Sequence, residues 1–239
     1  MSRIVARGYC QGDEKEFHGK AAELLKMAGG NLYYLLNRGY PVKGASVFVG
    51  NHYLLSERQR LALVRAVSPA ASIRRRREKE CKALPDGADV HIDGFNTVIT
   101  LEVALSGSTL LRCMDGCIRD LAGLRGTYRL IDKTETALMR IGEALEEKGA
   151  GRAIFYLDAP VSNSGRLKEE MMRVMAPFPF QTEVEVIHDV DRKLETMDHV
   201  ITGDAIILDK CKSWINLAGT IMEQTMEPYP YVDLHDVKE

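Results

Sequence analysis

The sequence lacks the features of a membrane, secreted or disulfide-linked protein. No apolar run approaches the roughly 18 residues that a membrane-spanning helix needs. The first residues, Met-Ser-Arg-Ile-Val, contain no apolar signal-peptide core. The five cysteines are scattered and odd in number, which is typical of reduced thiols rather than of a disulfide framework. These absences predict a cytoplasmic protein with no membrane segment.

Motifs of several common enzyme classes are also missing. The sequence has neither a phosphate-binding P-loop nor a strand-linked G-x-G-x-x-G that would bind a dinucleotide. It has no G-x-S-x-G nucleophile elbow, so we do not expect a serine hydrolase of that type. Cys113 and Cys117 are a single pair with no histidine nearby, which argues against a zinc site. Aspartates and arginines are therefore the residues most suited to carry chemistry.

Charge is unevenly distributed along the 239 residues. Residues 1–88 carry a net charge of +8 and residues 89–239 carry −10, which leaves −2 for the whole chain. The positive half predicts attraction to a polyanion, and the negative half predicts a site that uses carboxylates. A turn-rich stretch at 84–87 separates them. We expect a helical basic domain over 1–88, an α/β domain over 89–227 and an irregular tail over 228–239.

The N-terminal part has the apolar spacing of helices. Between residues 13 and 36 apolar residues recur at intervals of three and four, which predicts a helix that Gly29–Gly30 interrupts or weakens. Ser56 and Gln59 form a capping-box pattern at the start of another helix. A third, short helix carries four consecutive arginines: Arg74, Arg75, Arg76 and Arg77. They occupy all sides of a helix, so we expect some of them to bind RNA phosphates. The alternative is a solvated helix paired with nearby acids.

From residue 89 onward, short β-type runs alternate with longer helical patterns. This alternation predicts an α/β fold with a mostly parallel sheet flanked by helices. The expected strands are 90–92, 110–113, 153–157, 184–188 and 199–202, with 214–217 a weaker sixth. The expected helices are 97–105, 132–147, 165–175, 191–197 and 205–210. Asp132 and Glu135 form a cap pattern for the second of these helices.

An aspartate follows four of the expected strands: Asp93, Asp158, Asp189 and Asp204. Open parallel sheets bind their ligands beyond the carboxyl ends of the strands, so these side chains are expected to converge. Converging carboxylates repel one another unless a divalent cation lies among them, and oxygen ligands favour Mg²⁺ or Mn²⁺. Such an ion can assist the cleavage of a phosphodiester. The alternative interpretation is that each aspartate caps the following helix.

Two loops offer weaker candidates. Ser162 and Asn163 lie in a loop rich in small polar residues, which predicts either a phosphate site at a helix N-terminus or an ordinary capping loop. Asp115 precedes a glycine, so we expect a turn residue there, although it could be a fifth acid of the cluster.

Two motifs resemble those of PIN-like and NYN-type nuclease domains. Ile92-Asp93-Gly94-Phe95-Asn96 is similar to their opening motif, and His199-Val200-Ile201-Thr202-Gly203-Asp204 resembles a later strand that ends in Thr-x-Asp. The whole chain resembles an uncharacterised prokaryotic family, mainly archaeal, with a helical front and a PIN-like back. This resemblance implies metal-dependent cleavage of RNA, with Asp93 and Asp204 as metal ligands. Asn96 and Thr202 would orient water or phosphate.

Some features of the resemblance are incomplete, and other functions are compatible with the sequence. PIN-like nucleases often use a glutamate from a helix, for which Glu102 is one candidate, whereas Asp158 has no counterpart in the motifs. Asp189-x-Asp191 also fits a Toprim-like phosphotransfer site, although Toprim enzymes place a glutamate where this chain has Asp93. A third interpretation is a non-catalytic RNA-binding or scaffold protein. A homo-oligomer is compatible with all three.

Overall fold

The computed structural model describes residues 6–124 and 126–236. Its N-terminal part consists of helices α1 (Asp13–Phe17), α2 (Lys20–Asn37), α3 (Val42–His52), α4 (Glu57–Ala66) and α5 (Ala70–Glu78). The predicted capping box of α4 is confirmed, with the Ser56 hydroxyl accepting from the Gln59 amide. The predicted interruption at Gly29–Gly30 is wrong, because α2 continues through both glycines. Both are buried beside Leu25 and Leu32, and this packing outweighs the cost of about 1 kcal/mol for each helical glycine.

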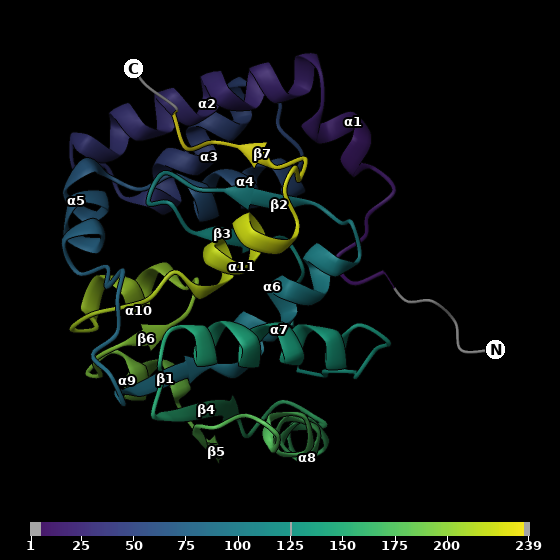
Figure 1. Cartoon of the computed structure of the whole chain (residues 1–239). Coiled ribbons are helices and arrows are strands. Elements are labelled where there is room, and N and C mark those ends of the chain that lie inside the picture. The colour runs from purple at the N-terminus through teal and green to yellow at the C-terminus, as the bar shows by residue number, and fades with distance from the viewer. Residues whose placement is uncertain (1–5, 125, 237–239) are drawn as a thin grey trace.

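The C-terminal part contains the predicted α/β sheet. Its strands are β1 (Asp89–Asp93), β4 (Arg152–Asp158), β5 (Gln181–Ile187) and β6 (Val200–Ile201). They lie in the order β5-β4-β1-β6, and every pairing among them is parallel. The chain therefore adds strands on one side of β1 and then crosses to its other side. Figure 1 shows this sheet below helices α2 to α4.

Helices α6 to α11 flank this parallel sheet. They are α6 (Gly94–Leu105), α7 (Thr134–Glu147), α8 (Ser164–Met175), α9 (Val190–Leu194), α10 (Ala205–Lys210) and α11 (Leu217–Thr225). The apolar face predicted for α7 is confirmed, since Leu138, Ile141 and Leu145 are all buried. Its predicted cap is wrong: the N-cap residue is Lys133, and no side chain caps the helix.

The core of this part is built on β1 and α6. Val90 and Ile92 of β1 are fully buried, as is Phe155 of the neighbouring β4. Helix α6 is buried almost all round, and Leu101 and Val103 on it are fully enclosed. Because β1 and α6 are enclosed by packing, the junction between them at Asp93 is held in a defined position.

A second sheet lies between the helices and the parallel sheet (Figure 1). Its strands are β2 (Leu110–Arg112), β3 (Ile118–Asp120) and β7 (Val232–Asp233), in the order β3-β2-β7. The predicted strand at 110–113 thus exists but does not belong to the parallel sheet. It pairs antiparallel with β3, because the chain reverses at Gly116, which has a φ of +88°.

The second sheet joins the two parts of the chain. Val232 and Leu234 are buried in one cluster with Leu111 and residues of α2 to α4, so this cluster crosses the predicted boundary at residue 88. The tail from residue 228, which was expected to be irregular, therefore contains a strand. The weak strand at 214–217 is absent: Trp214 makes only isolated bridges, and α11 begins at Leu217.

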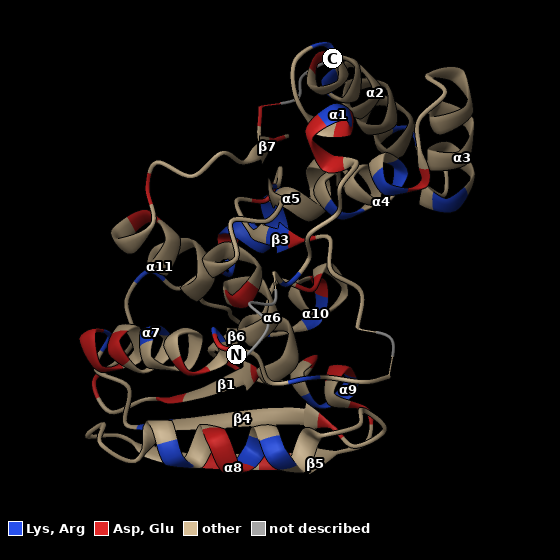
Figure 2. Cartoon of the chain, turned by 90° about the vertical axis from the view of Figure 1, so that its right-hand side faces the viewer, with Lys and Arg blue, Asp and Glu red and all other residues tan. Residues whose placement is uncertain are grey.

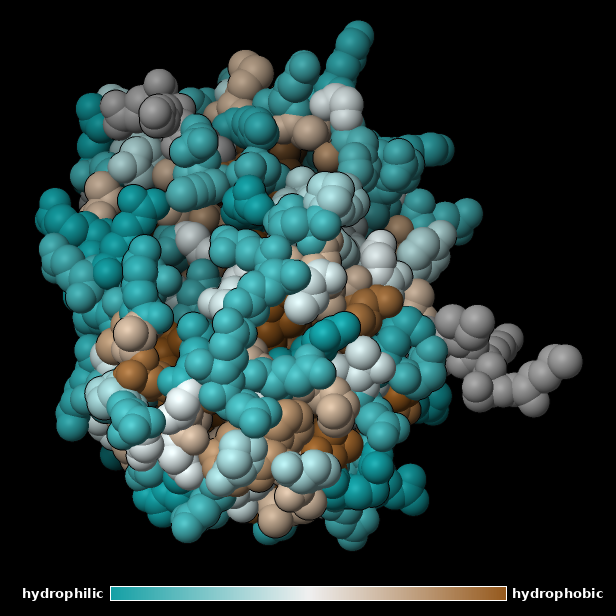
Figure 3. All heavy atoms as spheres, in the orientation of Figure 1, coloured by the Kyte–Doolittle hydropathy of each residue, from teal (hydrophilic) through white to brown (hydrophobic). Residues whose placement is uncertain are grey.

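The outer surface is mainly hydrophilic on the face seen in Figure 3, with small, separated apolar patches. None of the helices within residues 6–124 and 126–236 is long and apolar enough to cross a membrane.

Candidate functional site

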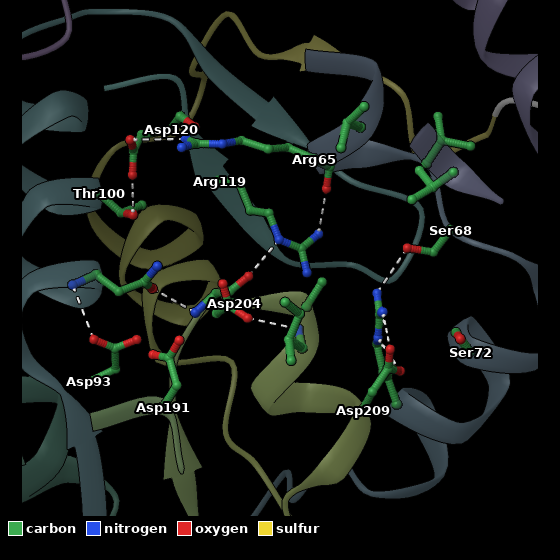
Figure 4. A pocket seen from close by; sticks show the side chains of 18 of the residues that line it. Arg65, Ser68, Ser72, Asp93, Thr100, Arg119, Asp120, Asp191, Asp204 and Asp209 are labelled. Atoms are coloured by element: carbon green, nitrogen blue, oxygen red, sulfur yellow. Dashed lines mark hydrogen bonds and ion pairs between the residues drawn. The ribbon is translucent and has the colours of Figure 1, made fainter. Parts of the chain in front are cut away.

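A cavity of about 710 Å³ lies at the edge of the parallel sheet, where the helical part meets it. Asp93 ends β1, Asp158 ends β4, and Asp204 follows β6, and all three line the cavity. These three residues, which are predicted to converge, thus share the lining of one cavity. A fourth lining aspartate, Asp191, comes from α9. Figure 4 shows Asp93, Asp191 and Asp204 close together on one side of the cavity.

Asp93 is held at the junction of β1 and α6. Its Oδ2 accepts a hydrogen bond of 2.8 Å from the Thr202 hydroxyl, and its Oδ1 accepts one of 3.4 Å from the Asn96 amide, which caps α6. Burial raises the pKa of Asp93 to about 7, although these hydrogen bonds oppose the rise. The negative charges of Asp191 and Asp204 raise it further. Asp93 is therefore a carboxylate whose ionisation is costly unless positive charge is nearby.

The loop that carries Asp204 is tied to the loop that carries Asp93. Thr202 Oγ1 accepts a hydrogen bond of 3.0 Å from the Asp204 amide while its own proton goes to Asp93. Asn96 Oδ1 accepts one of 2.7 Å from the Gly203 amide. Asn96 and Thr202 were predicted to orient water or phosphate. In the structure both hold the two acidic loops together, and Asn96 also lines the cavity.

Asp204 is also the N-cap of α10. Its Oδ1 accepts hydrogen bonds from the amides of Ile206 at 2.7 Å and Ile207 at 3.2 Å. Among the described residues no hydrogen bond to Asp204 Oδ2 occurs, so this oxygen is left for a ligand. Asp93 and Asp204 thus cap helices, as the alternative interpretation held, and in the same geometry face one cavity.

The predicted site residue Asp189 is replaced in the cavity lining by its neighbour Asp191. Asp189 does not line the cavity, whereas Asp191, two residues further on, does. Asp189 takes a left-handed backbone conformation with a φ of 57°, and this turn starts α9 and brings Asp191 to the cavity instead. Burial raises the pKa of Asp191, and the charges of Asp204 and Asp158 add to the effect. The pKa of Asp158 is raised by burial and by Asp189.

The acids are close enough to influence one another but do not form a closed metal cage. Within the part of the chain that the structure describes, no group of three His, Cys, Asp or Glu side chains could hold a metal ion. An ion at this edge would therefore take some of its ligands from water or from a substrate. Mg²⁺ commonly binds in this way, through one or two carboxylates plus waters and phosphates.

Of the four consecutive arginines, Arg76 is buried, whereas the other three are exposed. Figure 2 marks the basic residues of α5 in blue. Arg76 is buried and forms ion pairs with Asp115 and Asp209, both at 2.8 Å. Arg75 also binds Asp209, at 3.0 Å, and Arg77 donates to the carbonyl of Met114. The prediction that this run binds phosphates therefore needs correction at Arg76, whose guanidinium is occupied by buried carboxylates. Arg74 is exposed and has room for an external partner.

Two further predicted residues lie elsewhere. Asn163 lines a different cavity, with Arg129 and Arg166, and its side-chain amide donates to the Tyr128 carbonyl. Its neighbour Ser162 forms a backbone bridge and does not line the aspartate cavity. The loop at 162–163 is thus separate from the aspartates.

Glu102 does not complete the acidic site. It is fully buried on α6, where it forms an ion pair of 2.8 Å with Arg7 and accepts a hydrogen bond of 2.6 Å from Tyr128. Burial raises its pKa against these interactions. Its role is to join the segment around Arg7 to α6.

Several residues that line the cavity are not predicted from the sequence. Asp120 of β3 and Arg65 of α4 form a pair at 3.5 Å and line the cavity together. Arg119 and Asp209 line it as well. No spacing pattern marks these residues, because they come from the hairpin and the helices that tertiary packing brings to the sheet edge. Asp191 had a signal, the D-x-D pair, which was interpreted as a Toprim feature.

Part of the cavity lining is apolar and belongs to the helical part. It contains Leu36 at the end of α2, Tyr40 in the following turn, Val42 of α3 and Val64 of α4. Tyr40, Val42 and Val64 are exposed, by 57%, 44% and 42%. The cavity can therefore accept a molecule that combines an apolar group with groups suited to the acidic edge.

Comparisons with known proteins place the chain among proteins of unknown function. The family described as "Protein of unknown function (DUF434)" matches residues 24–79. The family described as "Domain of unknown function (DUF5616)" matches residues 82–220. No solved structure matches. The archaeal "Uncharacterized protein MJ0935" of Methanocaldococcus jannaschii is 34% identical over 177 residues, which cover 73% of this chain and 84% of that protein. The chain thus belongs to the DUF5616 family, and an archaeal relative accords with the uncharacterised family that its sequence resembles.

Proposed function

We propose that the protein is a ribonuclease of PIN-like type that hydrolyses RNA phosphodiesters with the help of Mg²⁺ or Mn²⁺. The observation that carries the proposal is the meeting of Asp93, Asp158, Asp191 and Asp204 in one cavity at the carboxyl edge of a parallel sheet. The nuclease-like motifs around Asp93 and Asp204 support the same function.

The topology of the sheet favours a ligand at this position. Strands β4 and β5 lie on one side of β1, and β6 lies on the other. The strand order therefore reverses next to β1, and in open α/β sheets ligands bind outside the carboxyl ends of the strands at this reversal. Asp93 and Asp204 follow the two strands that flank the reversal.

The chemistry of the lining suits a hard divalent ion. The four aspartates offer only oxygen ligands, which Mg²⁺ and Mn²⁺ prefer. Six aspartates but only three arginines line the cavity: Asp93, Asp120, Asp158, Asp191, Asp204 and Asp209 against Arg65, Arg76 and Arg119. An RNA phosphate would be repelled by this excess of negative charge without cations to offset it.

A bound ion would lower the pKa of a water molecule and neutralise charge on the phosphate. The protein's own contribution is to fix the carboxylates. The Thr202 hydroxyl orients Asp93, and the amides of α10 orient Asp204 so that its Oδ2 is available. With a pKa of about 7, Asp93 would lose its proton on holding an ion in the neutral pH range.

RNA is the substrate that best fits the apolar part of the cavity lining. Nucleobases present flat apolar faces, and Tyr40 with Val42 and Val64 offers an exposed apolar surface in the same cavity. Aromatic side chains that stack on unpaired bases are a general device of proteins that bind single strands.

A Toprim-like enzyme is a weaker candidate. Its D-x-D pair would be Asp189 and Asp191, but only Asp191 lines the cavity. Toprim enzymes would also need a glutamate near the end of the first strand, where this chain has Asp93. A non-catalytic RNA-binding protein remains an outcome of the experiment below.

The decisive experiment compares Asp191→Asn with Asp189→Asn, two isosteric changes two residues apart. Since Asp191 lines the cavity and Asp189 does not, we expect Asp191→Asn to slow Mn²⁺-dependent cleavage of labelled single-stranded RNA about 100-fold, as for other groups that act on a developing charge. Asp189→Asn should stay close to the wild type, because asparagine also tolerates the left-handed conformation.

Three results would decide between the functions. Equal loss in both variants would contradict the assignment of Asp191 to the site. Mn²⁺ binding by calorimetry without cleavage of any RNA would favour a non-catalytic binding protein. Neither binding nor cleavage by the wild type would refute the proposed function.

A further inference from the structure

A chain of buried ion pairs connects the helical part to the loop of Asp204. At its centre is Asp115, which is 2% exposed and binds two arginines. Arg76 of α5 donates to its Oδ2 at 2.8 Å, and Arg119 of β3 donates to the same oxygen at 2.6 Å. Burial alone would raise the pKa of Asp115, but the two arginines lower it to about 2. The pairs therefore stay charged at all ordinary pH values.

Both arginines reach beyond Asp115 to the segment that contains Asp204. Arg119 Nε donates to the Gly203 carbonyl at 2.5 Å, directly before Asp204. Arg76 donates through Nε and Nη2 to Asp209 at 2.9 and 2.8 Å. Asp209 lies near the C-terminal end of α10, and Asp204 is the N-cap of this helix. The same chain of charges thus contacts α10 at both ends. Figure 4 shows Arg119 beside the segment of Asp204, and Asp209 at the other end of this helix.

Helix α10 needs such external support. It has six residues, which is far below the length at which an isolated helix is stable. The direction of the Asp204 carboxylate depends on it, because Oδ1 is fixed by the amides of Ile206 and Ile207. If α10 frays, these amides move and Asp204 Oδ2 loses its aim into the cavity.

We propose that Arg76 and Arg119, joined through Asp115, are positioning residues for Asp204. By this proposal the helical part completes the acidic site through Arg76. The positioning of α10 follows from the contacts alone. Its consequence for an ion rests on the proposed function.

Two substitutions with opposite charge effects test the proposal. Arg76→Gln removes a positive charge, and Asp209→Asn removes a negative one. In both variants Asp115 keeps Arg119, so no buried charge loses all its partners. A purely through-space effect would strengthen Mn²⁺ binding in Arg76→Gln and weaken it in Asp209→Asn. Positioning weakens binding in both, by about tenfold, as for other residues that orient metal ligands.

Hydrogen exchange of the α10 amides provides a readout that does not require activity. The amides of Leu208 and Cys211 are bonded within α10, to the carbonyls of Asp204 and Ile207. We expect their exchange to be about tenfold faster in both variants, while amides of α6 keep their rates. Glu78→Gln, an exposed change on α5, is the control and should alter neither readout.

Unchanged exchange in α10, or tighter Mn²⁺ binding by Arg76→Gln, would overturn the proposal. Arg76→Lys, which keeps the charge but not the paired donors, should lie between the wild type and Arg76→Gln and serves if the latter does not fold. A wild type that binds no Mn²⁺ would refute the proposed function. The exchange rates would still decide whether α10 is positioned by Arg76.

Discussion

Asp93 shows how one residue can serve two purposes. It caps α6 through the Asn96 amide, which accounts for an aspartate at this junction without any ligand. Its pKa of about 7 is a cost that a simple cap does not need, because an exposed cap would keep its ordinary pKa. The combination of a cap and a costly ionisation favours a residue that is kept for its charge.

The raised pKa predicts a particular pH dependence of stability. Because the folded protein holds the Asp93 proton up to about pH 7 and the unfolded chain loses it near pH 4, the contribution of this residue to the free energy of unfolding falls as pH rises between these values. Asp93→Asn cannot ionise, so it should remove this fall and be more stable than the wild type at pH 8, by on the order of 2–4 kcal/mol. Urea unfolding of both proteins in EDTA at pH 5 and pH 8 measures this difference in the free energy of unfolding.

The control for this prediction is Asp86→Asn, an exposed aspartate in the turn before β1. Its unfolding curves should match those of the wild type at both pH values. If the difference in stability between pH 5 and pH 8 persists in Asp93→Asn, another group is responsible for it.

At the level of elements, the contact between α6 and β4 depends on a glycine. A side-chain carbon at Gly94 would lie 2.7 Å from Leu157 Cδ2 and 2.9 Å from the Tyr156 carbonyl oxygen. These distances are well inside van der Waals contact, so α6 can start this close to β4 only without a side chain. The glycine after Asp93 in the nuclease-like motif therefore has a packing reason of its own.

Gly94→Ala should therefore destabilise the protein, by about 1–3 kcal/mol, as for other overpacked cores. Gly165→Ala in α8 is the matched control, because nothing lies within 4 Å of the added carbon and alanine favours the helix. We expect Gly165→Ala to be neutral or more stable in urea unfolding. Equal stability of Gly94→Ala and the wild type would show that β4 can shift without cost.

For the whole molecule, the main finding is the place of the helical part beside the acidic edge of the sheet. Its positive charge suggested an RNA-binding surface. Instead, Arg76 is buried in ion pairs, and this part lines the cavity with apolar side chains such as Val64 as well as with Arg65 and Arg76. By the proposed function, affinity for RNA then comes from the ion and from base contacts as well as from exposed arginines such as Arg74.

Base contacts can be tested at Tyr40. If Tyr40 stacks on a nucleobase, Tyr40→Ala should raise KM for single-stranded RNA about tenfold, since such stacking contributes roughly 1–3 kcal/mol. Its kcat should change little, because Tyr40 has no hydrogen bond or ion pair with the carboxylates of the cavity among the described residues. Phe48→Ala is the control: Phe48 is an aromatic residue of α3 that is 67% exposed and does not line this cavity. Equal changes in KM for both variants would contradict a specific base contact.

The local and periodic features of this protein are predictable from its amino-acid sequence. Apolar periodicity located most helices, and β-type runs located β1, β4, β5 and β6, because these signals depend on residues adjacent in the chain. The parallel arrangement placed Asp93, Asp158 and Asp204 at one edge, since strands joined by helical crossovers end on the same side.

Other features became visible only in the folded chain. The left-handed turn at Asp189 places Asp191, instead of Asp189, in the cavity lining. The reversal at Gly116 pairs β2 with β3, so β2 belongs to a second sheet. The pairing of Arg76 with Asp115 and Asp209 turned an expected phosphate site into a buried support. The ion pair between Arg76 and Asp209 joins residues 133 positions apart, and local spacing carries no signal for such a contact.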